Sequence, residues 1–479
     1  MKRLYLYGPP ASGKSTMARR LAESAGISYV DLDEEIVRRQ GRSIPEIFAT
    51  DGEKAFRDIE SGTLRDVTAP IVALGGGTLL RAANRKWAER HGFVVVLEVD
   101  DETIARRIEA QKGTRPLGNK LAERRPHYAS FDHHADADTA ILIPRHLKGS
   151  VTPPVSKSHL HRLLIALFLS GVKVKDLPVN GDEGADIDAT LRCLKAIEDG
   201  GSVLDCGESG STLRFFAPLA AALGVKAEFV RRGRLAERPM IEYPTISPGL
   251  HELAGDVSSQ FATGLLFALP LLAGDSEIRF TSPLQSRGYV DMTLDVISRF
   301  GISVEETPSG FLVPGNQKYS APAEPVVPER DWSGGAFWHA ANALGARITV
   351  EGLSMMSRQP DKAVCALIDS ICNNGEVDVS GCPDNYPALA VVNHVLGAHA
   401  VFTGTERLRL KESDRISAME SVFASPDDVD PRNDHRIAMA AAILAMASGS
   451  PAVIHSASCV KKSYPGFWSE LARLGREEM

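Results

Sequence analysis

Residues 8–16 read Gly-Pro-Pro-Ala-Ser-Gly-Lys-Ser-Thr and lie between an apolar strand predicted at Arg3–Tyr7 and a helix predicted to start at Lys14. Glycines allow backbone N–H groups to point at phosphate oxygens, a lysine here reaches the outer phosphates, and Ser15 offers a hydroxyl to Mg²⁺. Strand, loop and helix in this order are the context that a phosphate-binding loop requires. The predicted ATP contacts in the loop are Gly8, Ala11, Ser12, Gly13, Lys14, Ser15 and Thr16.

Outward from the loop, short apolar segments alternate with helical ones. Strands are predicted at Tyr29–Val30, Ile71–Leu74 and Val94–Leu97. Such alternation favours a parallel sheet with helices on both faces. The pattern continues to about residue 140 and passes into Ile-Leu-Ile-Pro (141–144) without a Gly/Ser-rich spacer, so the two halves of the chain are expected to lie close together.

Three further features narrow the class of nucleotide-binding domain: Asp31-Leu-Asp33, Arg57, and the glycine run 75–77. With these features residues 1–140 resemble shikimate kinase. The resemblance implies that Ser15 and Asp31 hold Mg²⁺. It further implies catalysis and shikimate binding by Asp33, shikimate contacts from Arg57, Gly76 and Arg124, and an ATP-facing lid arginine at Arg115. Arg145 is a further candidate, for the adenine ring.

Composition excludes some functions. The chain has 479 residues, more than one core usually supports, and a net charge of −7 provides no general basic field for nucleic acid. The six cysteines show no CxxC pair and no metal-ligand spacing with histidine. No apolar run approaches the roughly 20 residues of a membrane span. We therefore expect a cytoplasmic enzyme with small-molecule substrates, no nucleic-acid or membrane partner, and an oligomeric state that the sequence leaves unknown.

The second half carries cationic residues beside small polar ones, a composition that suits a substrate with several anionic groups. Its motifs include VSKSHLHR (155–162), GESGSTLR (207–214), SSQF (258–261), LKESDR (410–415) and NDHR (433–436). In this order they resemble 5-enolpyruvylshikimate-3-phosphate (EPSP) synthase. The resemblance implies two lobes, each an inside-out α/β barrel of βαβαββ repeats, some of them shortened. The fold class is therefore α/β throughout, with residues 141–479 as the second domain: lobe 1 from 141–156 and 332–479, and lobe 2 from 157–331.

The resemblance also implies two ligand sets and no cofactor for this half. The residues implied to contact shikimate 3-phosphate are Lys157, Ser158, Arg162, Ser258, Ser259, Gln260, Ser286, Asp384 and Lys411. The residues implied to contact phosphoenolpyruvate are Lys157, Gly210, Arg238, Gln260, Arg415, Arg436 and Lys462.

Enolpyruvyl transfer removes a proton from the 5-hydroxyl of the acceptor and adds one to the methylene carbon, and the adduct then expels phosphate. Asp384 is the predicted acceptor of the hydroxyl proton, and Glu412 the group that exchanges a proton with the methylene carbon. Lys157 is predicted to stabilise charge on the departing or bridging oxygen. The sequence departs from the family at Glu208 and Arg407, where asparagine is usual.

The sequence therefore predicts a bifunctional enzyme of aromatic amino-acid biosynthesis, in which the product of the first domain is the substrate of the second. Two alternatives stay open at this point. One half is a ligand-binding or regulatory pseudoenzyme, or a kinase for another small metabolite is fused to a UDP-sugar enolpyruvyl transferase.

Overall fold

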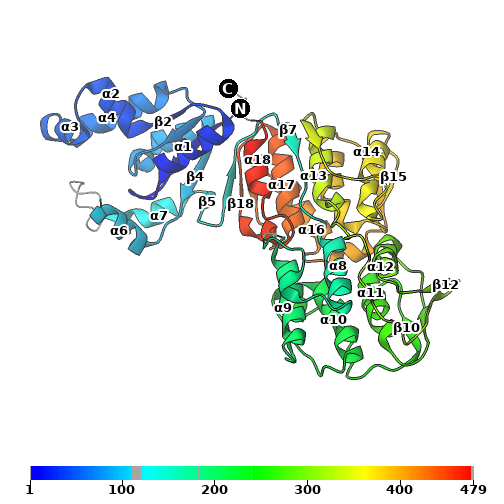
Figure 1. Cartoon of the computed structure of the whole chain (residues 1–479). Coiled ribbons are helices and arrows are strands. Elements are labelled where there is room, and N and C mark those ends of the chain that lie inside the picture. Colours follow the sequence, from blue (N-terminus) through cyan, green and yellow to red (C-terminus); the bar gives the residue numbers. More distant parts are fainter. Residues whose placement is uncertain (1, 111–119, 182, 239, 476–479) are drawn as a thin grey trace.

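The computed structural model describes residues 2–110, 120–181, 183–238 and 240–475 (Figure 1). The N-terminal domain is built on a parallel sheet with strand order β2-β3-β1-β4-β5. Its strands are β1 (Arg3–Tyr7), β2 (Tyr29–Asp31), β3 (Ile71–Ala73), β4 (Gly92–Leu97) and β5 (His133–Ala135). The first four lie where the sequence predicted strands, and β5 was not predicted.

Helices cover both faces of this sheet, because successive strand residues point to opposite sides. Tyr5 and Tyr7 belong to one buried apolar cluster, whereas Leu4 and Leu6 belong to another. The helices are α1 (Lys14–Ala25), α2 (Leu32–Gln40), α3 (Ile44–Thr50), α4 (Gly52–Asp66), α5 (Ala82–His91), α6 (Asp101–Ala110) and α7 (Lys120–Tyr128). Residues of α2, α3, α4 and α5 pack in the first cluster and residues of α1 in the second. The three-layer parallel domain predicted from the sequence is confirmed.

The rest of the chain forms two lobes with separate cores. The lower lobe in Figure 1, lobe 2, has one core cluster that runs from Leu160 to Tyr319. Its helices are α8 (Lys157–Leu169), α9 (Ala185–Glu198), α10 (Gly210–Ala222), α11 (Ser259–Ala268) and α12 (Arg287–Arg299). Its strands are β8 (Val203–Gly207), β9 (Glu228–Arg231), β10 (Gly249–Leu253), β11 (Ser276–Phe280), β12 (Glu305–Thr307) and β13 (Gly310–Val313).

Lobe 1 draws its core from both sides of lobe 2 in the sequence: Leu142 to Val151, and Trp332 to Leu474. Its helices are α13 (Trp332–Ala343), α14 (Val364–Cys372), α15 (Tyr386–Val395), α16 (Arg415–Ala424), α17 (His435–Ser448) and α18 (Phe467–Arg473). Its strands are β6 (Ala140–Leu142), β7 (Lys148–Val151), β14 (Arg347–Val350), β15 (Glu376–Asp378), β16 (Val401–Thr403), β17 (Asp428–Val429) and β18 (Ala452–Ile454). The described strands of the two lobes form separate sheets of two to four strands, and barrel closure stays a prediction.

The chain crosses between the lobes twice, and the two crossings lie side by side. Ser156 N donates to Glu329 O at 2.7 Å, and Asp331 N donates to Pro154 O at 2.9 Å. Val155 and Arg330 form a β-bridge between these bonds. The lobes are thus joined by a paired double connection.

The N-terminal domain packs directly against lobe 1. Ile141, Ile143 and Val453 belong to the same buried cluster as Leu4 and Leu6 of β1, so lobe 1 completes one face of the N-terminal sheet. The expectation that the halves lie close together is confirmed. Within the described ranges, no helix combines the length and apolarity that crossing a bilayer requires.

The suggestion that Arg145 contacts adenine is wrong. Its guanidinium donates to Ser24 O at 2.8 Å and to Leu471 O at 2.5 Å, and so bridges the end of α1 to α18. Ser24 lies at the opposite end of α1 from the phosphate-binding loop, about 15 Å along the helix axis.

Candidate active sites

The phosphate-binding loop connects β1 to α1, and its backbone conformation requires glycine at two positions. Gly8 and Gly13 have φ angles of 129° and 95°, in the left-handed region. A Cβ on Gly8 would lie 2.9 Å from the carbonyl oxygen of Leu97 in β4. Lys14 is 8% exposed, and its ammonium donates to Gly8 O at 3.1 Å and Pro9 O at 2.6 Å. Burial lowers the pKa of Lys14 to about 8, against the opposing effect of two nearby aspartates.

Those aspartates lie directly beside the loop. Asp31 caps α2 by accepting from Asp33 N at 3.0 Å, and its other oxygen accepts from Ser15 Oγ at 2.5 Å. Asp33 adjoins Gly75, where a Cβ would lie 2.9 Å from its Oδ1. A hydroxyl and a carboxylate therefore meet at the start of α1, with a second carboxylate next to the glycine run.

The two predicted carboxylate-binding arginines, Arg57 and Arg124, both lie near enough to the Tyr7 hydroxyl to act on its pKa. The Arg57 guanidinium is 2.7 Å from Glu60 Oε2 and lies where any side chain on Gly77 would stand. Burial raises the pKa of the Tyr7 hydroxyl, while the positive charges of Arg124 and Arg57 oppose that rise. Gly76 packs on the loop, since its Cβ would lie 3.0 Å from Pro10 Cδ. Arg115 lies outside the described residues.

A cleft of about 900 Å³ opens on the other side of the loop, a volume suited to a nucleotide-sized ligand. Pro9 and Ser12 line it together with residues that follow β4 and β5. Arg107 of α6 also lines it and donates to Ala11 O at 3.0 Å. Sequence reasoning missed Arg107, because an arginine on an amphipathic helix has no distinguishing pattern.

A second cavity, of about 90 Å³, lies between lobes 1 and 2. All nine residues assigned to the first anionic ligand line it, as do Lys157, Gly210, Arg238 and Gln260 of the second set. Three residues of the second set lie just beyond its lining. Arg415 and Arg436 contact the cavity residue Asp384, and Lys462 contacts Glu208. Residues scattered over some 300 positions are thus gathered at one place.

The five α-helices that the structure describes in lobe 2 begin at this cavity. Lys157, Asp186, Gly210 and Ser259 lie in the first turns of α8, α9, α10 and α11, and Ser286 occupies the N-cap position of α12. In lobe 1, α16 and α17 begin beside the same space, at Arg415 and His435. Free backbone N–H groups and the positive ends of helix dipoles favour anions, so the fold itself makes this an anion site.

The cavity's carboxylates are held by its cations. Asp384 is within 3.2 Å of Lys411 Nζ, 2.8 Å of Arg415 Nη1 and 2.9 Å of Arg436 Nη2. Burial alone would raise the pKa of Asp384, but these three charges hold it well below its usual range. Glu412 accepts from Arg415 Nη2 at 2.8 Å, and Arg415 and Arg238 likewise keep its pKa low despite burial.

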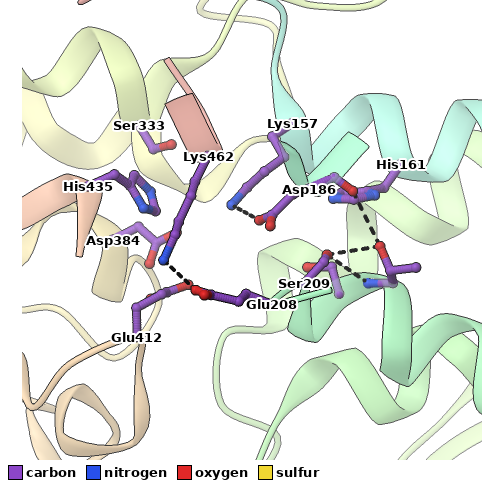
Figure 2. A network of polar contacts seen from close by, with 12 residues as sticks. Lys157, His161, Asp186, Glu208, Ser209, Ser333, Asp384, Glu412, His435 and Lys462 are labelled. Atoms are coloured by element: carbon purple, nitrogen blue, oxygen red, sulfur yellow. Dashed lines mark hydrogen bonds and ion pairs between the residues drawn. The ribbon is translucent and has the colours of Figure 1, made fainter. Parts of the chain in front are cut away.

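Lys157 faces Glu412 across the cavity and is paired with Asp186 at 2.8 Å (Figure 2). Burial would lower the pKa of Lys157, yet the carboxylates of Asp186 and Glu412 raise it. Arg162 is buried without any carboxylate partner in the described part of the chain and donates instead to Ser158 O, Thr293 Oγ1 and Tyr289 O.

Comparison with known proteins identifies both halves. Residues 10–140 match the family model described as shikimate kinase, and residues 241–424 and 420–471 match the model described as EPSP synthase (3-phosphoshikimate 1-carboxyvinyltransferase). The 3-phosphoshikimate 1-carboxyvinyltransferase of Clostridium kluyveri is 37% identical over 417 aligned residues, which cover 70% of this chain and 97% of that protein. The chain belongs to the EPSP synthase family.

Another similar EPSP synthase is that of Clostridium perfringens, 32% identical over 418 residues that cover 70% of this chain and 98% of that protein. A solved EPSP synthase from Acinetobacter baumannii shares the fold, with a TM-score of 0.55 at 19% identity, and covers 70% of this chain and 98% of that one. The chain therefore joins a shikimate kinase domain to an EPSP synthase domain, as in a bifunctional enzyme of the shikimate pathway.

The cavity lining also includes residues to which the sequence assigned no role, among them Asp186, Ser211 and Tyr289. Tyr289 OH donates to Asp361 Oδ2 at 2.8 Å across the lobes, and Ser211 Oγ accepts from Gln260 Nε2 at 2.9 Å. Arg407, one of the departures from the family, also lines the cavity and donates to Ser286 Oγ at 2.8 Å. Each serves to fix a predicted ligand residue or to join the lobes.

Proposed function

We propose that the residues described above carry out two consecutive steps: ATP-dependent phosphorylation of shikimate, then transfer of the enolpyruvyl group of phosphoenolpyruvate to the 5-hydroxyl of shikimate 3-phosphate. The observation that carries this proposal is the interlobe cavity, where helix N-termini and cationic side chains surround two ionised carboxylates, Asp384 and Glu412. A site that only bound anions would have no use for those carboxylates.

In the kinase domain, Asp33 accepts the proton of the shikimate hydroxyl, and Arg57 and Arg124 hold the shikimate carboxylate. Two guanidinium groups fix orientation as well as charge. Lys14 accompanies the transferred phosphoryl group, and the position of its ammonium beside Gly8 O and Pro9 O of the loop supports this role. Burial at this site also excludes water, which protects the phosphoryl group from hydrolysis.

Mg²⁺ is the expected companion of ATP here. Ser15 Oγ and Asp31 Oδ2 fit it, because they are adjacent oxygen donors at the start of α1, the type of ligand that Mg²⁺ prefers. Among the described residues no group of three or more His, Cys, Asp or Glu side chains forms a metal cage, which agrees with a cation held mainly by phosphate and water. When bound, the ion neutralises developing charge on the phosphates.

In the synthase domain, Asp384 accepts the 5-hydroxyl proton as the hydroxyl oxygen bonds to C2 of phosphoenolpyruvate. Its three cationic neighbours keep Asp384 ionised but also make it a weak base. The phosphate of one ligand and the phosphate and carboxylate of the other add negative charge to the site. Ligand binding therefore raises the basicity of Asp384 when it is needed.

The same argument gives Glu412 its two roles. It is ionised in the free protein because of Arg415 and Arg238, and the added anions raise its pKa so that it carries a proton to the methylene carbon. It then takes a proton back from the resulting methyl group as the bond between C2 and the phosphate oxygen breaks. Lys157 stabilises the negative charge on that departing oxygen, the proton that Asp384 accepted passes to the released phosphate, and the products are EPSP and inorganic phosphate.

The division into a kinase domain at 1–140 and a synthase domain at 141–479, with lobe 2 at 157–331, is part of the proposal. The separate apolar clusters of the two lobes and the paired crossings at Val155 and Arg330 support it. We also propose that the enzyme works in the cytoplasm.

One assay tests both activities: full-length protein is given shikimate, ATP and phosphoenolpyruvate, and ADP and phosphate are measured separately. Lys14→Ala is expected to abolish shikimate-dependent ADP release while phosphate release from supplied shikimate 3-phosphate continues. Glu412→Gln keeps the shape but removes the titratable acid, so it is expected to slow phosphate release on the order of 10²-fold or more with ADP release unchanged. Loss of both activities in either folded variant contradicts the assignment.

A further inference from the structure

We infer that Glu208 is a positioning residue that holds Lys462 across the interlobe cleft and thereby strengthens phosphoenolpyruvate binding. Glu208 lies in lobe 2 between β8 and α10, and Lys462 is the last residue of the short helix η8 (Ala457–Lys462) in lobe 1. Their side chains meet with Nζ 2.7 Å from Oε2 (Figure 2). The inference rests on the proposed function of the synthase domain and concerns its second substrate.

Asn433 completes the contact. The Lys462 ammonium donates to Asn433 O at 2.8 Å, and the Asn433 side-chain amide donates to the same Glu208 oxygen at 3.2 Å. These three residues, which we call the interlobe clamp, form a closed set of polar contacts between the lobes. An ammonium has three N–H donors, and the contacts among the described residues engage two of them here, so the third can meet a ligand oxygen.

The Glu208 carboxylate packs closely against the backbone of Gly233. Gly233, which opens the short helix η3 (Gly233–Ala236), has a φ of 53°, and a Cβ there would lie 2.9 Å from Glu208 Oε1. From the next position Arg234 reaches over the cleft and donates to Glu412 O at 3.2 Å. The backbone thus holds the carboxylate against Lys462 at the rim where the lobes meet.

The clamp acts on ligand affinity more than on stability. Glu208 is 38% exposed, and an ion pair that solvent reaches contributes little to folding. A lysine side chain, however, loses considerable rotamer freedom when it is fixed, and a lysine already fixed in the free protein loses less when the ligand arrives. The asparagine usual at position 208 has no negative charge to hold an ammonium, so this device is a property of the present chain.

The test compares Glu208→Gln with the parent in the full-length protein. Phosphate release is measured at saturating shikimate 3-phosphate while phosphoenolpyruvate is varied, at about 20 mM and about 300 mM KCl, where the screening length falls from roughly 20 Å to 6 Å. The variant is expected to raise the KM for phosphoenolpyruvate on the order of fivefold at low salt, with kcat nearly unchanged. At high salt the parent is expected to approach the variant, since salt screens the pair.

Glu228→Gln is the matched control, because Glu228 is an exposed carboxylate on β9 of the same lobe. It is expected to leave the KM unchanged, and unaltered shikimate-dependent ADP release reports that each variant is folded. A lower KM in Glu208→Gln means that the carboxylate repels the substrate, and an unchanged KM means that it has no role; either result overturns the inference. If the parent itself releases no phosphate, the proposed function fails instead.

Discussion

At the scale of single residues, Lys411 shows how the cavity adjusts a charge. Burial lowers its pKa to about 8, although the adjacent Asp384 carboxylate pulls the other way. The Lys411 side chain attracts an anionic ligand only while its amine is protonated. The free enzyme therefore loses one binding charge as pH rises through that value.

We predict that kcat/KM for shikimate 3-phosphate falls as pH rises through about 8, because this parameter reports ionisations of the free enzyme. Lys411→Arg is expected to abolish this fall in kcat/KM, since a guanidinium stays charged at every accessible pH. The measurement is a pH series of initial phosphate release at low shikimate 3-phosphate. Lys318→Arg, at an exposed lysine of lobe 2, should still show the fall in kcat/KM. If Lys411→Arg also shows it, the assignment of this pH dependence to Lys411 is falsified.

Asp186 is an example of a cavity residue that could not be predicted from the sequence. A carboxylate in the first turn of a helix is ordinarily explained by the helix dipole, and nothing in the pattern of α9 sets it apart. Its partner, Lys157, lies 29 residues away, so the pair exists only once α8 and α9 pack. The predicted ligand residues that line the cavity could be picked out because they occur in motifs such as 155–162 and 258–261, where several candidate positions lie close together in the sequence.

At the scale of elements, the site depends on how closely α10 and α11 approach. Gly264 of α11 makes that approach possible, because a Cβ there would lie 2.3 Å from Arg214 O and 2.8 Å from Pro218 Cγ in α10. The two helices carry Gly210 at one N-terminus and Gln260 at the other. Their spacing therefore sets the distance between ligand contacts.

We predict that Gly264→Ala lowers the free energy of unfolding by about 1–3 kcal/mol, as overpacking does, and raises the KM values for both synthase substrates. Thermal unfolding and phosphate release measure the two effects. Gly62→Ala is the matched control: Gly62 lies inside α4 with no atom within 4 Å of an added Cβ, so helix propensity alone should stabilise it by about 0.5–1 kcal/mol. A neutral Gly264→Ala would show that α10 and α11 can separate without cost.

Strand β5 marks the limit of prediction at this scale. Its three residues, His133 to Ala135, carry no apolar alternation, and the segment reads from the sequence as an acidic, histidine-containing connection. It becomes a strand because β4 lies on one side and lobe 1 on the other. His133 Nδ1 is 3.0 Å from Asp428 Oδ2 of β17, a contact that the local sequence around either residue does not predict.

At the scale of the molecule, the lobes meet through several side chains, of which Ser286 and Tyr289 also line the interlobe cavity. Ser286 Oγ donates to Ser380 O at 2.8 Å, and Tyr289, Arg234 and Glu208 make the further contacts described above. A cavity of about 90 Å³ is too small for two anionic substrates, which ordinarily need several hundred Å³. We therefore predict that substrates enter a more open form, and that closure brings the two halves of each anion site together.

We predict that shikimate 3-phosphate, which touches both lobes, favours closure and so strengthens phosphoenolpyruvate binding by about 1–3 kcal/mol. Calorimetric titration of phosphoenolpyruvate with and without saturating shikimate 3-phosphate measures this coupling, in Lys14→Ala protein so that the kinase is silent. Equal affinities in the two titrations would rule the closure argument out.

The kinase domain also depends on lobe 1. Val453 is fully buried in the cluster that contains Leu4 and Leu6. Val453→Ala is therefore expected to lower the free energy of unfolding by about 1–3 kcal/mol and to shorten the half-life of the kinase activity, measured as ADP release, at raised temperature. Val391→Ala, at an equally buried valine within the lobe 1 core, should affect phosphate release more than ADP release. An unchanged half-life of the kinase activity in Val453→Ala would contradict the dependence.

The shared cluster has a consequence for biosynthesis. The kinase sequence leaves the ribosome first, but Val453, which covers one face of its sheet, emerges only after lobe 2 and most of lobe 1 have been made. At roughly 5–20 residues per second, the nascent kinase sheet stays partly uncovered for roughly 15–60 s. During that interval the face of the sheet that carries Leu4 and Leu6 lacks part of its apolar cover, so the kinase domain is completed only after most of the synthase domain has been made.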